Sequence, residues 1–488
     1  MRRPPLEGLT LQIITEAIDW LNTILYSYLL IYLLAGAGLY FTIRTRFVQV
    51  RLFPAMVRTM AHSRENARGG ISSFQAFAIG LASRIGTGNI AGVAIAITLG
   101  GPGAVFWMWL IAVLGMATAF VEATLAQVFK MRWHDGTFRG GPAFYIWRGL
   151  RSRGWGAVFA VALLFAFGIV FEMAQANTMA DTLAKSHGVP QWASALIIGL
   201  LVGVVILGGL RQVAKVAEIV APVMALVYIV LALVVIVLNI DEIGFVFSEI
   251  FTSAFGLSEA FAGTAGGFTA AILNGVKRGL FSNEAGMGSA PNAASTATTD
   301  HPVRQGLIQA MGVFVDTMLV CSATAFIILT ADASIYTPGA SLEGASLTQS
   351  AVVSHLGGWI ALPMTVLICV FAYSSIIGNY AYAEVNLDYL TGDRGHYDLY
   401  LRVAVIGAAM LGALLKIELV WGLADVAMGA MALVNLVAIL LLGKWAIGAL
   451  RDYEASGGAP FVAIDNPHLP GRLDTDIWTA DNATGQGA

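Results

Sequence analysis

Charged residues are scarce in this chain. Only 12% of its 488 residues are charged and 57% are hydrophobic, whereas a soluble domain has roughly 25% charged and about 45 to 50% apolar residues. The composition excludes a soluble multidomain enzyme and an intrinsically disordered chain. The net charge of −3 gives no basis for binding nucleic acid, which requires a strongly basic surface. A polytopic membrane protein remains.

Residues that commonly form metal or nucleotide sites are also few. The two cysteines, Cys321 and Cys369, lie in apolar stretches and are interpreted as buried thiols rather than as a disulfide. None of the seven histidines is spaced from another His or Cys as zinc ligands are. No Gly-x-x-x-x-Gly-Lys-Ser/Thr loop occurs. A zinc hydrolase and an ATP-driven pump are therefore disfavoured, and no nucleophile-base pair indicates any other enzyme.

Long apolar stretches, in contrast, are abundant. A helix needs about 20 mostly apolar residues to cross the hydrocarbon core. Eleven stretches qualify, at residues 23–43, 72–99, 103–129, 156–179, 191–209, 214–239, 260–284, 304–331, 356–388, 400–417 and 420–448. The sequence therefore predicts an all-α polytopic membrane protein with eleven transmembrane helices. The polar residues 451–488 are predicted to form a loosely ordered tail.

Basic residues predict the orientation, because cytoplasmic loops carry an excess of Lys and Arg. Twenty of them fall on one side of the predicted membrane: Arg44, Arg46, Arg51, Arg58, Arg64, Arg68, Lys130, Arg132, Arg139, Arg148, Arg151, Arg153, Arg211, Lys215, Arg304, Arg394, Arg402, Lys444, Arg451 and Arg472. The other side has four: Arg2, Arg3, Lys185 and Lys416. We expect the amino terminus outside and the carboxyl terminus in the cytoplasm. Apolar residues among the arginines of residues 44–70 also predict a helix along the inner membrane interface.

Two predicted spans contain sequence that does not suit lipid. The second includes Ser83-Arg84-Ile85-Gly86-Thr87-Gly88-Asn89, and the seventh includes residues 274–284, with Lys277 and Arg278 among glycines. Charges at this depth are costly and tend to line cavities or pair within the protein. Each break begins a run of five spans, and the second run has the opposite direction. Broken helices at matching places in two inverted halves indicate the binding site of a secondary transporter.

The segments therefore divide as follows: residues 1–71 form an N-terminal helix with a basic interfacial segment, 72–240 a five-helix repeat, 241–258 an extracellular linker, 259–450 the inverted repeat and 451–488 a cytoplasmic tail. Free N–H groups at a half-helix start attract a carboxylate, and freed carbonyls can bind a small cation. An amino acid and a cation suit such a site. Side-chain amides within the spans that are candidates to line it are Asn89, Gln175, Asn274, Asn283 and Asn379.

Several sequence runs resemble the alanine or glycine:cation symporter family across nearly all of residues 15–450. They are residues 86–93 (Gly-Thr-Gly-Asn-Ile-Ala-Gly-Val), 100–109, 140–142 (Gly-Gly-Pro) and 278–291, which begins Arg-Gly-Leu-Phe-Ser-Asn-Glu. The resemblance implies a LeuT-type fold, with two inverted five-helix repeats and one extra N-terminal helix. It also implies Na⁺-driven uptake of small neutral amino acids, with no cofactor other than the coupling Na⁺.

The resemblance also implies roles for particular residues. Groups expected to bind the substrate carboxylate are Gly86, Thr87, Gly88 and Asn89. Gln175 is expected to accept from the substrate ammonium, while Gly279, Phe281 and Asn283 belong to the second break. The carbonyls of Ala82 and Ile85, with the hydroxyls of Ser374 and Ser375, would form a Na⁺ site of hard oxygen ligands. Family members more often have Thr at the serine positions.

One position departs from the family pattern. Members commonly have Gly-Trp in the ninth span where this chain has Gly378-Asn379. If the tryptophan normally walls the pocket, Asn379 would enlarge it and add an amide, so that a longer polar amino acid such as glutamine becomes a candidate substrate. Alternatively, Tyr373 or Tyr380 refills the space.

The leading hypothesis is thus a Na⁺-coupled amino acid symporter of the plasma membrane, of a bacterial inner membrane in particular, acting as a monomer among lipids. Proton coupling and an ion channel are the alternatives. Five acids lie within the predicted spans: Glu122, Glu172, Asp316, Glu384 and Asp425. We expect them to form static or gating pairs with Arg84, Lys277 or Arg278 rather than to carry protons.

Overall fold

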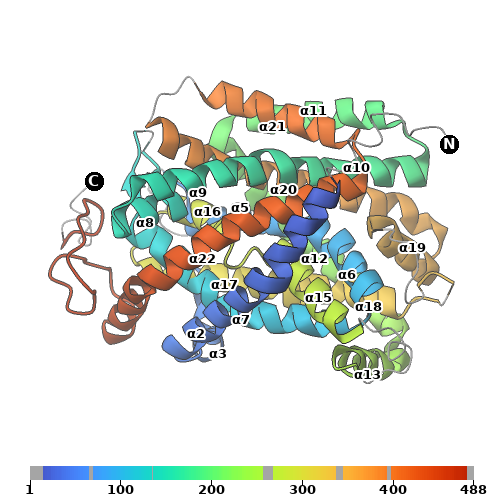
Figure 1. The fold of residues 1–488 in the computed structure, drawn as a ribbon, viewed down its shortest axis with the longest axis horizontal. Coiled ribbons are helices and arrows are strands. Elements are labelled where there is room, and N and C mark those ends of the chain that lie inside the picture. Colours follow the sequence, from blue (N-terminus) through green and yellow to red (C-terminus); the bar gives the residue numbers. More distant parts are fainter. Residues whose placement is uncertain are drawn as a thin grey trace.

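The computed structural model describes residues 15–64, 70–134, 136–256, 267–332, 334–336, 344–392 and 397–480. Helices dominate this part of the chain, and its only strands are the short antiparallel pair β1 (Met131–Arg132) and β2 (Phe138–Arg139). A membrane chain must form helices or closed barrels, because each backbone N–H and C=O has to find a partner inside the protein. The all-α membrane fold predicted from the sequence is confirmed. Several long helices run along the longest axis of the molecule (Figure 1).

The first half of the core begins with a broken helix. Its elements are α5 (Ser73–Arg84), η2 (Gly88–Gly92), α6 (Val93–Gly100), α7 (Gly103–Val128), α9 (Arg153–Phe165), η3 (Ala166–Val170), α10 (Phe171–His187), α11 (Gln191–Ile206) and α12 (Gly209–Leu238). The chain bends by 48° between α5 and the helix that follows. The segments α9, η3 and α10 form one continuous helix of 35 residues.

The second half also begins with an interrupted helix. Its elements are α15 (Gly267–Asn283), α16 (Ala290–Thr296), α17 (Pro302–Val313), η5 (Phe314–Cys321), α18 (Ser322–Leu329), α19 (Gly344–Leu356), η6 (Gly358–Ile360), α20 (Ala361–Thr391), α21 (Asp398–Gly412) and α22 (Ile417–Ala455). The helix α19 falls between the eighth and ninth predicted spans and was not expected. It packs against η2 and α20, near the right end of the molecule in Figure 1.

Seven helices of the described chain are long and apolar enough to cross a membrane, and the bent pair α5 and α6 makes an eighth. Helix α11 is apolar but shorter. Each of the eleven predicted stretches overlaps a helix, although residues 260–266 of the seventh lie outside the described residues. The count of eleven membrane crossings stays a prediction.

The second break lies further along the chain than the sequence predicted. Helix α15 continues through residues 274–283, and the backbone leaves helical geometry only between Asn283 and Ala290. Gly286 and Gly288 have φ of +87° and +82° there, which glycine adopts readily. Gly275 instead allows close packing, because a Cβ on it would lie 2.5 Å from the Ala104 carbonyl oxygen. Glycines for packing were thus mistaken for glycines that interrupt the helix.

Short helices surround the core. On the amino-terminal side they are α3 (Val48–Arg51) and α4 (Phe53–Ala61), which follow η1 (Thr23–Leu30) and α2 (Ile31–Arg44), two parts of one 30-residue helix that is long enough to cross a membrane. Helices α3 and α4 lie within residues 44–70, where the sequence predicted a helix, and the position of this helix at the membrane interface stays a prediction; Arg68 lies outside the described residues. The other peripheral helices are α8 (Pro142–Gly149), η4 (Ile240–Glu242) and α13 (Ile243–Ala254). Helix α13 occupies most of the predicted linker and packs on the first turns of α7, where Trp107 Nε1 donates to the Ala254 carbonyl at 3.1 Å.

The carboxyl-terminal tail is packed against the helices, contrary to the loosely ordered extension that the sequence predicted. Trp478 is buried, and its Nε1 donates to the Gln127 carbonyl oxygen at 3.1 Å. The Lys130 ammonium lies 4.8 Å from the centre of the Trp478 ring. Burial lowers the pKa of the Lys130 amine well below its usual value. The described residues 456–480 therefore fold onto the end of α7 (left side of Figure 1).

Candidate substrate and sodium site

The first break exposes backbone N–H groups that would otherwise be bonded within a helix. Asn89 Oδ1 accepts from the Gly86 N–H at 3.0 Å, and Gln175 Oε1, from α10, accepts from the Thr87 N–H at 3.1 Å. Two side-chain carbonyl oxygens thus satisfy the free donors of the break. A carboxylate has oxygens of the same kind and binds such donors more strongly.

Gly86 is required for this arrangement. A Cβ atom on Gly86 would lie 2.0 Å from Ser375 Oγ of α20 and 3.1 Å from Gln175 Oε1. Real Cβ atoms do not approach other atoms to 2.0 Å, so a larger residue would displace the Ser375 side chain. Gly88 is nearly as restricted, because its Cβ would lie 3.0 Å from the ring of Phe281. The glycines of the break thus bring both halves of the core into contact.

The Asn89 amide joins the first break to the second half of the core. Its Nδ2 lies 2.9 Å from Ser282 Oγ and 2.6 Å from Asp316 Oδ1. Ser282 Oγ donates to the other oxygen of Asp316 at 2.8 Å. Asn283, next in α15, donates to Thr317 Oγ1 at 3.2 Å. The predicted residues Asn89 and Asn283 therefore share one network, which also includes Ser282 and Asp316.

Carboxylates hold the unwound backbone of the second break. Glu284 Oε1 accepts from Ser83 Oγ at 2.7 Å, and its Oε2 accepts from Ser289 Oγ at 2.5 Å. Glu122 of α7 accepts from the Gly286 N–H at 3.2 Å and from Asn435 Nδ2 at 2.9 Å. The break is thus fastened on one side to the first broken helix and on the other to α7 and α22.

Four aromatic rings form a continuous stack beside the breaks. Phe167, Phe171, Phe281 and Trp421 follow one another with centroid distances of 4.4, 4.6 and 4.7 Å and interplanar angles of at most 23°. Phe281, predicted to contribute to the site, is the third ring. The stack connects η3, α10, α15 and α22, so it forms an apolar wall between the two halves of the core.

Asn379 lies at the centre of these contacts. It is fully buried, and Ser83 Oγ lies 2.6 Å from its Oδ1. Its Nδ2 has no hydrogen-bond partner among the described residues. The Asn379 amide also interacts electrostatically with the carboxyl group of Glu172. The Nδ2 group of Asn379 therefore has no well-aligned hydrogen bond and can donate to a ligand.

The predicted sodium ligands come together where α20 contacts the end of α5. Ser375 Oγ lies 3.0 Å from the Ala82 carbonyl oxygen and 2.9 Å from that of Ser83. Ser374 Oγ lies 3.4 Å from the Ala82 oxygen. Four hard oxygens therefore meet here, which is the donor set that suits Na⁺. The structure adds the Ser83 carbonyl, while the Ile85 carbonyl remains a predicted ligand.

Two predicted substrate residues lie elsewhere. Asn274 donates from Nδ2 to the Ala270 carbonyl of its own helix at 2.9 Å. Gly279 faces α7, since a Cβ on it would lie 2.8 Å from Ile111 Cγ2. Because the break lies after residue 283, these positions belong to the regular part of α15. They pack the helix and do not join the network around Asn89.

The buried acids differ in their partners. Asp425 lies 2.5 Å from Arg278 Nη2 and 3.1 Å from Lys277 Nζ, so the expected static pairing is confirmed there. Glu384 has Arg139 at 4.0 Å, a partner that was not expected. Glu122 and Asp316 accept hydrogen bonds from neutral groups, as described above. Within the described chain, neither oxygen of Glu172 accepts a hydrogen bond in good geometry.

Sequence reasoning missed several residues of the site, namely Ser83, Ser282, Glu284, Ser289 and Thr317. Serine is common in membrane helices and gives no signal of its own. The structure itself gives a better signal, the π-helical segments η2, η3 and η5, since such turns occur frequently at functional sites. Asn89 and Asp316 lie within η2 and η5, and Glu172 is the second residue after η3.

Two matched helix breaks, with a cation-type oxygen cluster beside one of them, define a membrane transporter of the LeuT-type fold. The structure is similar to the crystal structure of MhsT in complex with L-phenylalanine, with a TM-score of 0.57 and 13% identity over 77% of this chain and 95% of that one. It is also similar to the Eremococcus coleocola manganese transporter, with a TM-score of 0.52 and 14% identity over 85% and 83% of the two chains. At these identities the likeness shows the fold alone.

Residues 11–459 match the model of the sodium:alanine symporter family, and the chain belongs to this family. It is 47% identical to the probable sodium/glutamine symporter GlnT of Bacillus subtilis, over 91% of both chains. It is 41% identical to the sodium/alanine symporter AgcS of Methanococcus maripaludis, over 90% of this chain and 96% of that one. The protein is therefore an integral membrane transporter and not an enzyme, as the sequence predicted.

Proposed function

We propose that this protein carries a neutral amino acid into the cell together with Na⁺, by alternating access of one site to the two sides of the membrane. The observation that carries the proposal is the first break, where two N–H groups that donate to side chains and a cluster of four oxygens lie within one short segment. The N–H groups suit an anion, and the oxygen cluster suits a small cation. A zwitterionic amino acid with Na⁺ uses both.

The substrate carboxylate would replace two side-chain oxygens. It would accept from the N–H groups of Gly86 and Thr87, which now donate to Asn89 Oδ1 and Gln175 Oε1. Gln175 Oε1, once released, can accept from the substrate ammonium. Without substrate, Asn89 and Gln175 thus accept from the backbone N–H groups of the break. With substrate, these N–H groups bind its carboxylate and Gln175 binds its ammonium.

Sodium would bind between the hydroxyl oxygens of two serines and two backbone carbonyl oxygens, once the hydroxyl hydrogens turn away. Ser374 and Ser375 now donate toward backbone carbonyls. On rotation of the O–H bonds their oxygen lone pairs face the same space as the carbonyls of Ala82 and Ser83. Because Ser83 also contacts Asn379, a change in the sodium site is transmitted directly to the substrate site.

The proposed substrate class follows from residue 379, which is Asn in this chain and commonly Trp in the family. Relatives of this chain are named after alanine and after glutamine. An Asn in place of a bulky tryptophan provides a polar side chain where the family commonly has an apolar wall. We include alanine, glycine and longer polar neutral amino acids, glutamine in particular, in the proposed range.

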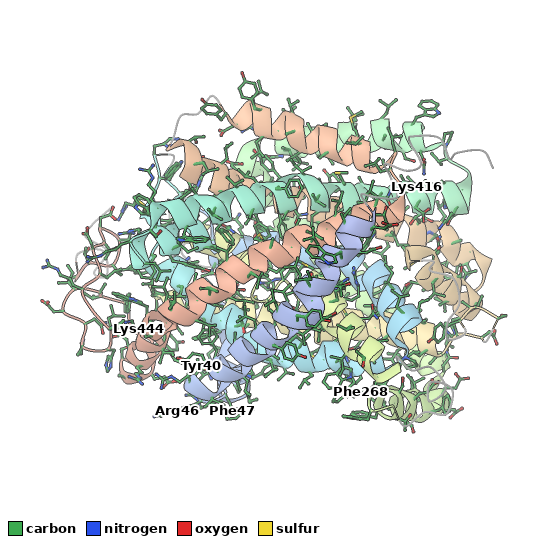
Figure 2. All side chains as sticks on the ribbon, viewed as in Figure 1. Tyr40, Arg46, Phe47, Phe268, Lys416 and Lys444 are labelled. Carbon is green, nitrogen blue, oxygen red and sulfur yellow. The ribbon has the colours of Figure 1, made fainter. Side chains whose placement is uncertain are left out.

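The proposed orientation places the amino terminus outside and the carboxyl terminus in the cytoplasm. Figure 2 shows Arg46 and Lys444, two bases assigned to the inner side, toward the left of the molecule. Lys416, assigned to the outer side, lies toward the right. The separation of these bases supports the assignment made from the loops. Residues 1–14, with Arg2 and Arg3, lie outside the described residues. The proposed assembly is a monomer in the plasma membrane.

Uptake into proteoliposomes tests the proposal. Purified protein is reconstituted, and uptake of radiolabelled alanine and glutamine is measured with an inward gradient of Na⁺, Li⁺ or H⁺. We expect saturable uptake that requires Na⁺ and is inhibited by neutral amino acids. Uptake driven by H⁺ alone would assign proton coupling instead, and unsaturable flux would assign a channel.

A further inference from the structure

Glu172 is the least satisfied acid of the core. It is 0% exposed, and neither of its carboxyl oxygens has a hydrogen-bond partner within the described residues. The Asn379 amide interacts with the Glu172 carboxyl group, and Asn379 Nδ2 also forms no hydrogen bond of good geometry in the described chain. An acceptor group and a donor group therefore interact with each other, but neither forms a well-aligned hydrogen bond.

This pair belongs to the transport site rather than to the helix packing around it. Glu172 precedes Gln175 by three residues in α10, so both lie on one face of that helix, and Gln175 accepts from the first break at Thr87. Asn379 contacts the break from α20 through Ser83. Phe171, next to Glu172, stacks on Phe281 at 4.6 Å. The pair thus adjoins both the predicted carboxylate position and the aromatic wall.

Leaving such groups unsatisfied is costly. A buried polar group without a hydrogen bond is unfavourable by about 1–3 kcal/mol, and a charged one by more. Native structures therefore satisfy nearly all of them with protein, water or ligand. Each of the other buried acids of the core has at least one oxygen with a partner, as Glu284 and Asp316 have in neighbouring hydroxyls and amides and Asp425 has in Arg278. The exception at Glu172 indicates a ligand group.

We propose that Glu172 and Asn379 form a subsite that recognises the side-chain carboxamide of a transported amino acid, which makes glutamine or asparagine the preferred substrate class. The proposal rests on the proposed function, since it names the side-chain specificity of the same site. Gly86, Thr87 and Gln175 bind the main chain of the substrate, and Glu172 and Asn379 bind its side chain.

The two groups are complementary to a primary amide. A carboxamide has two N–H donors and one carbonyl acceptor. The N–H donors match the oxygens of Glu172, and the carbonyl matches the free Nδ2–H of Asn379. An alanine side chain offers none of these groups. A site of this kind discriminates strongly, because a substrate without the amide leaves both protein groups unpaired.

The ratio of KM for glutamine to KM for alanine is the quantity that tests the subsite. Full-length Glu172→Leu and Asn379→Leu proteins are compared with the wild type in Na⁺-driven uptake by proteoliposomes. We expect each variant to raise the ratio by roughly tenfold or more. Glu172→Gln, which retains one acceptor oxygen, should raise it less, and it provides the test if the leucine variants do not fold.

A matched control uses a glutamate outside the site. Glu218 of α12 is half-buried and accepts from Gln75 at 2.9 Å, and Glu218→Gln should leave the ratio unchanged. An unchanged ratio in Glu172→Leu would overturn the subsite. So would an equal rise of both KM values, which assigns Glu172 to the substrate ammonium.

The failure of this inference is distinguishable from failure of the proposed function. If the wild type carries alanine with Na⁺ but neither glutamine nor asparagine, the subsite is wrong and symport stands. If the wild type shows no Na⁺-dependent uptake of any neutral amino acid, the proposed function itself is wrong.

Discussion

A Cβ atom built on Gly86 would lie 2.0 Å from the hydroxyl oxygen of Ser375. The two residues belong to the broken helix and to α20, and Ser375 in turn lies 3.0 Å from the Ala82 carbonyl oxygen. The proposed substrate and sodium sites therefore meet at residue 86, where the hydrogen atom of a glycine fits but a Cβ atom does not. This contact explains why the break needs glycine at residue 86, independently of any backbone dihedral angle.

Gly86→Ala is expected to reduce Na⁺-dependent uptake strongly. The added methyl group must displace Ser375, and overpacking of this kind costs about 1–3 kcal/mol, which corresponds to a loss of roughly five- to a hundredfold in affinity. The measurement is initial uptake by purified, reconstituted protein. Gly407→Ala is the matched control, because nothing lies within 4 Å of a Cβ at that position. Equal activity of the two variants would contradict the steric argument.

Ser375→Ala is expected to raise the Na⁺ concentration for half-maximal uptake by about tenfold, a change of about 1.4 kcal/mol. The variant removes one of four oxygens from the proposed cation site. Ser374→Ala should have a smaller effect, because its hydroxyl bonds mainly to the Phe371 carbonyl of its own helix, at 2.8 Å. Sodium titrations of uptake measure both.

A serine outside the core provides the control for these titrations. Ser354 is exposed and bonds to the Ala351 carbonyl of its own helix. Ser354→Ala should leave the sodium dependence unchanged. If Ser375→Ala behaves in the same way, the cation site lies elsewhere.

The membrane fold could be predicted from the sequence because its apolar stretches are long. The first break could be predicted because polar and charged residues interrupt one of these stretches. Apolar stretches mark the helices, and Arg84 with Gly86 and Gly88 stands out within one of them. The second break was misplaced for a physical reason. Gly275 and Gly279 permit close packing on α7, whereas Gly286 and Gly288 adopt positive φ, and composition does not separate these uses.

The side-chain network was harder to predict, since it depends on contacts between distant segments. Asn89 and Asn379 stand out as amides in apolar helices, and the structure places both at the centre. Glu172 gave only the general signal of an acid within a span. Its importance follows from the structure, in which neither of its oxygens forms a hydrogen bond of good geometry with the described residues. Whether such a bond forms depends on the relative positions of α10 and α20.

Asp425→Asn is expected to destabilise the protein strongly. Asp425 lies 2.5 Å from Arg278 Nη2 in a buried pair, and removing one partner of a buried pair costs about 3–5 kcal/mol because the other charge is left uncompensated. The measurement is the midpoint of thermal unfolding of purified protein. Asp181→Asn is the control, since the Asp181–Lys185 pair is partly exposed and such pairs contribute about 0.2–1 kcal/mol. Similar shifts for both variants would mean that the Asp425 pair is solvated.

Trp478→Ala is expected to lower the thermal stability of the protein, although the residue lies in the tail. Trp478 is 3% exposed and bonds to Gln127 at the end of α7, so truncation leaves a cavity and an unpaired carbonyl, at a cost of about 3–5 kcal/mol. Trp192→Ala is the control, because Trp192 is 65% exposed. A shift of the unfolding midpoint confined to Trp478→Ala would show that the tail is part of the folded core. Equal unfolding midpoints for the two variants would mean that the tail does not pack on α7, and Lys130 would then be exposed to water.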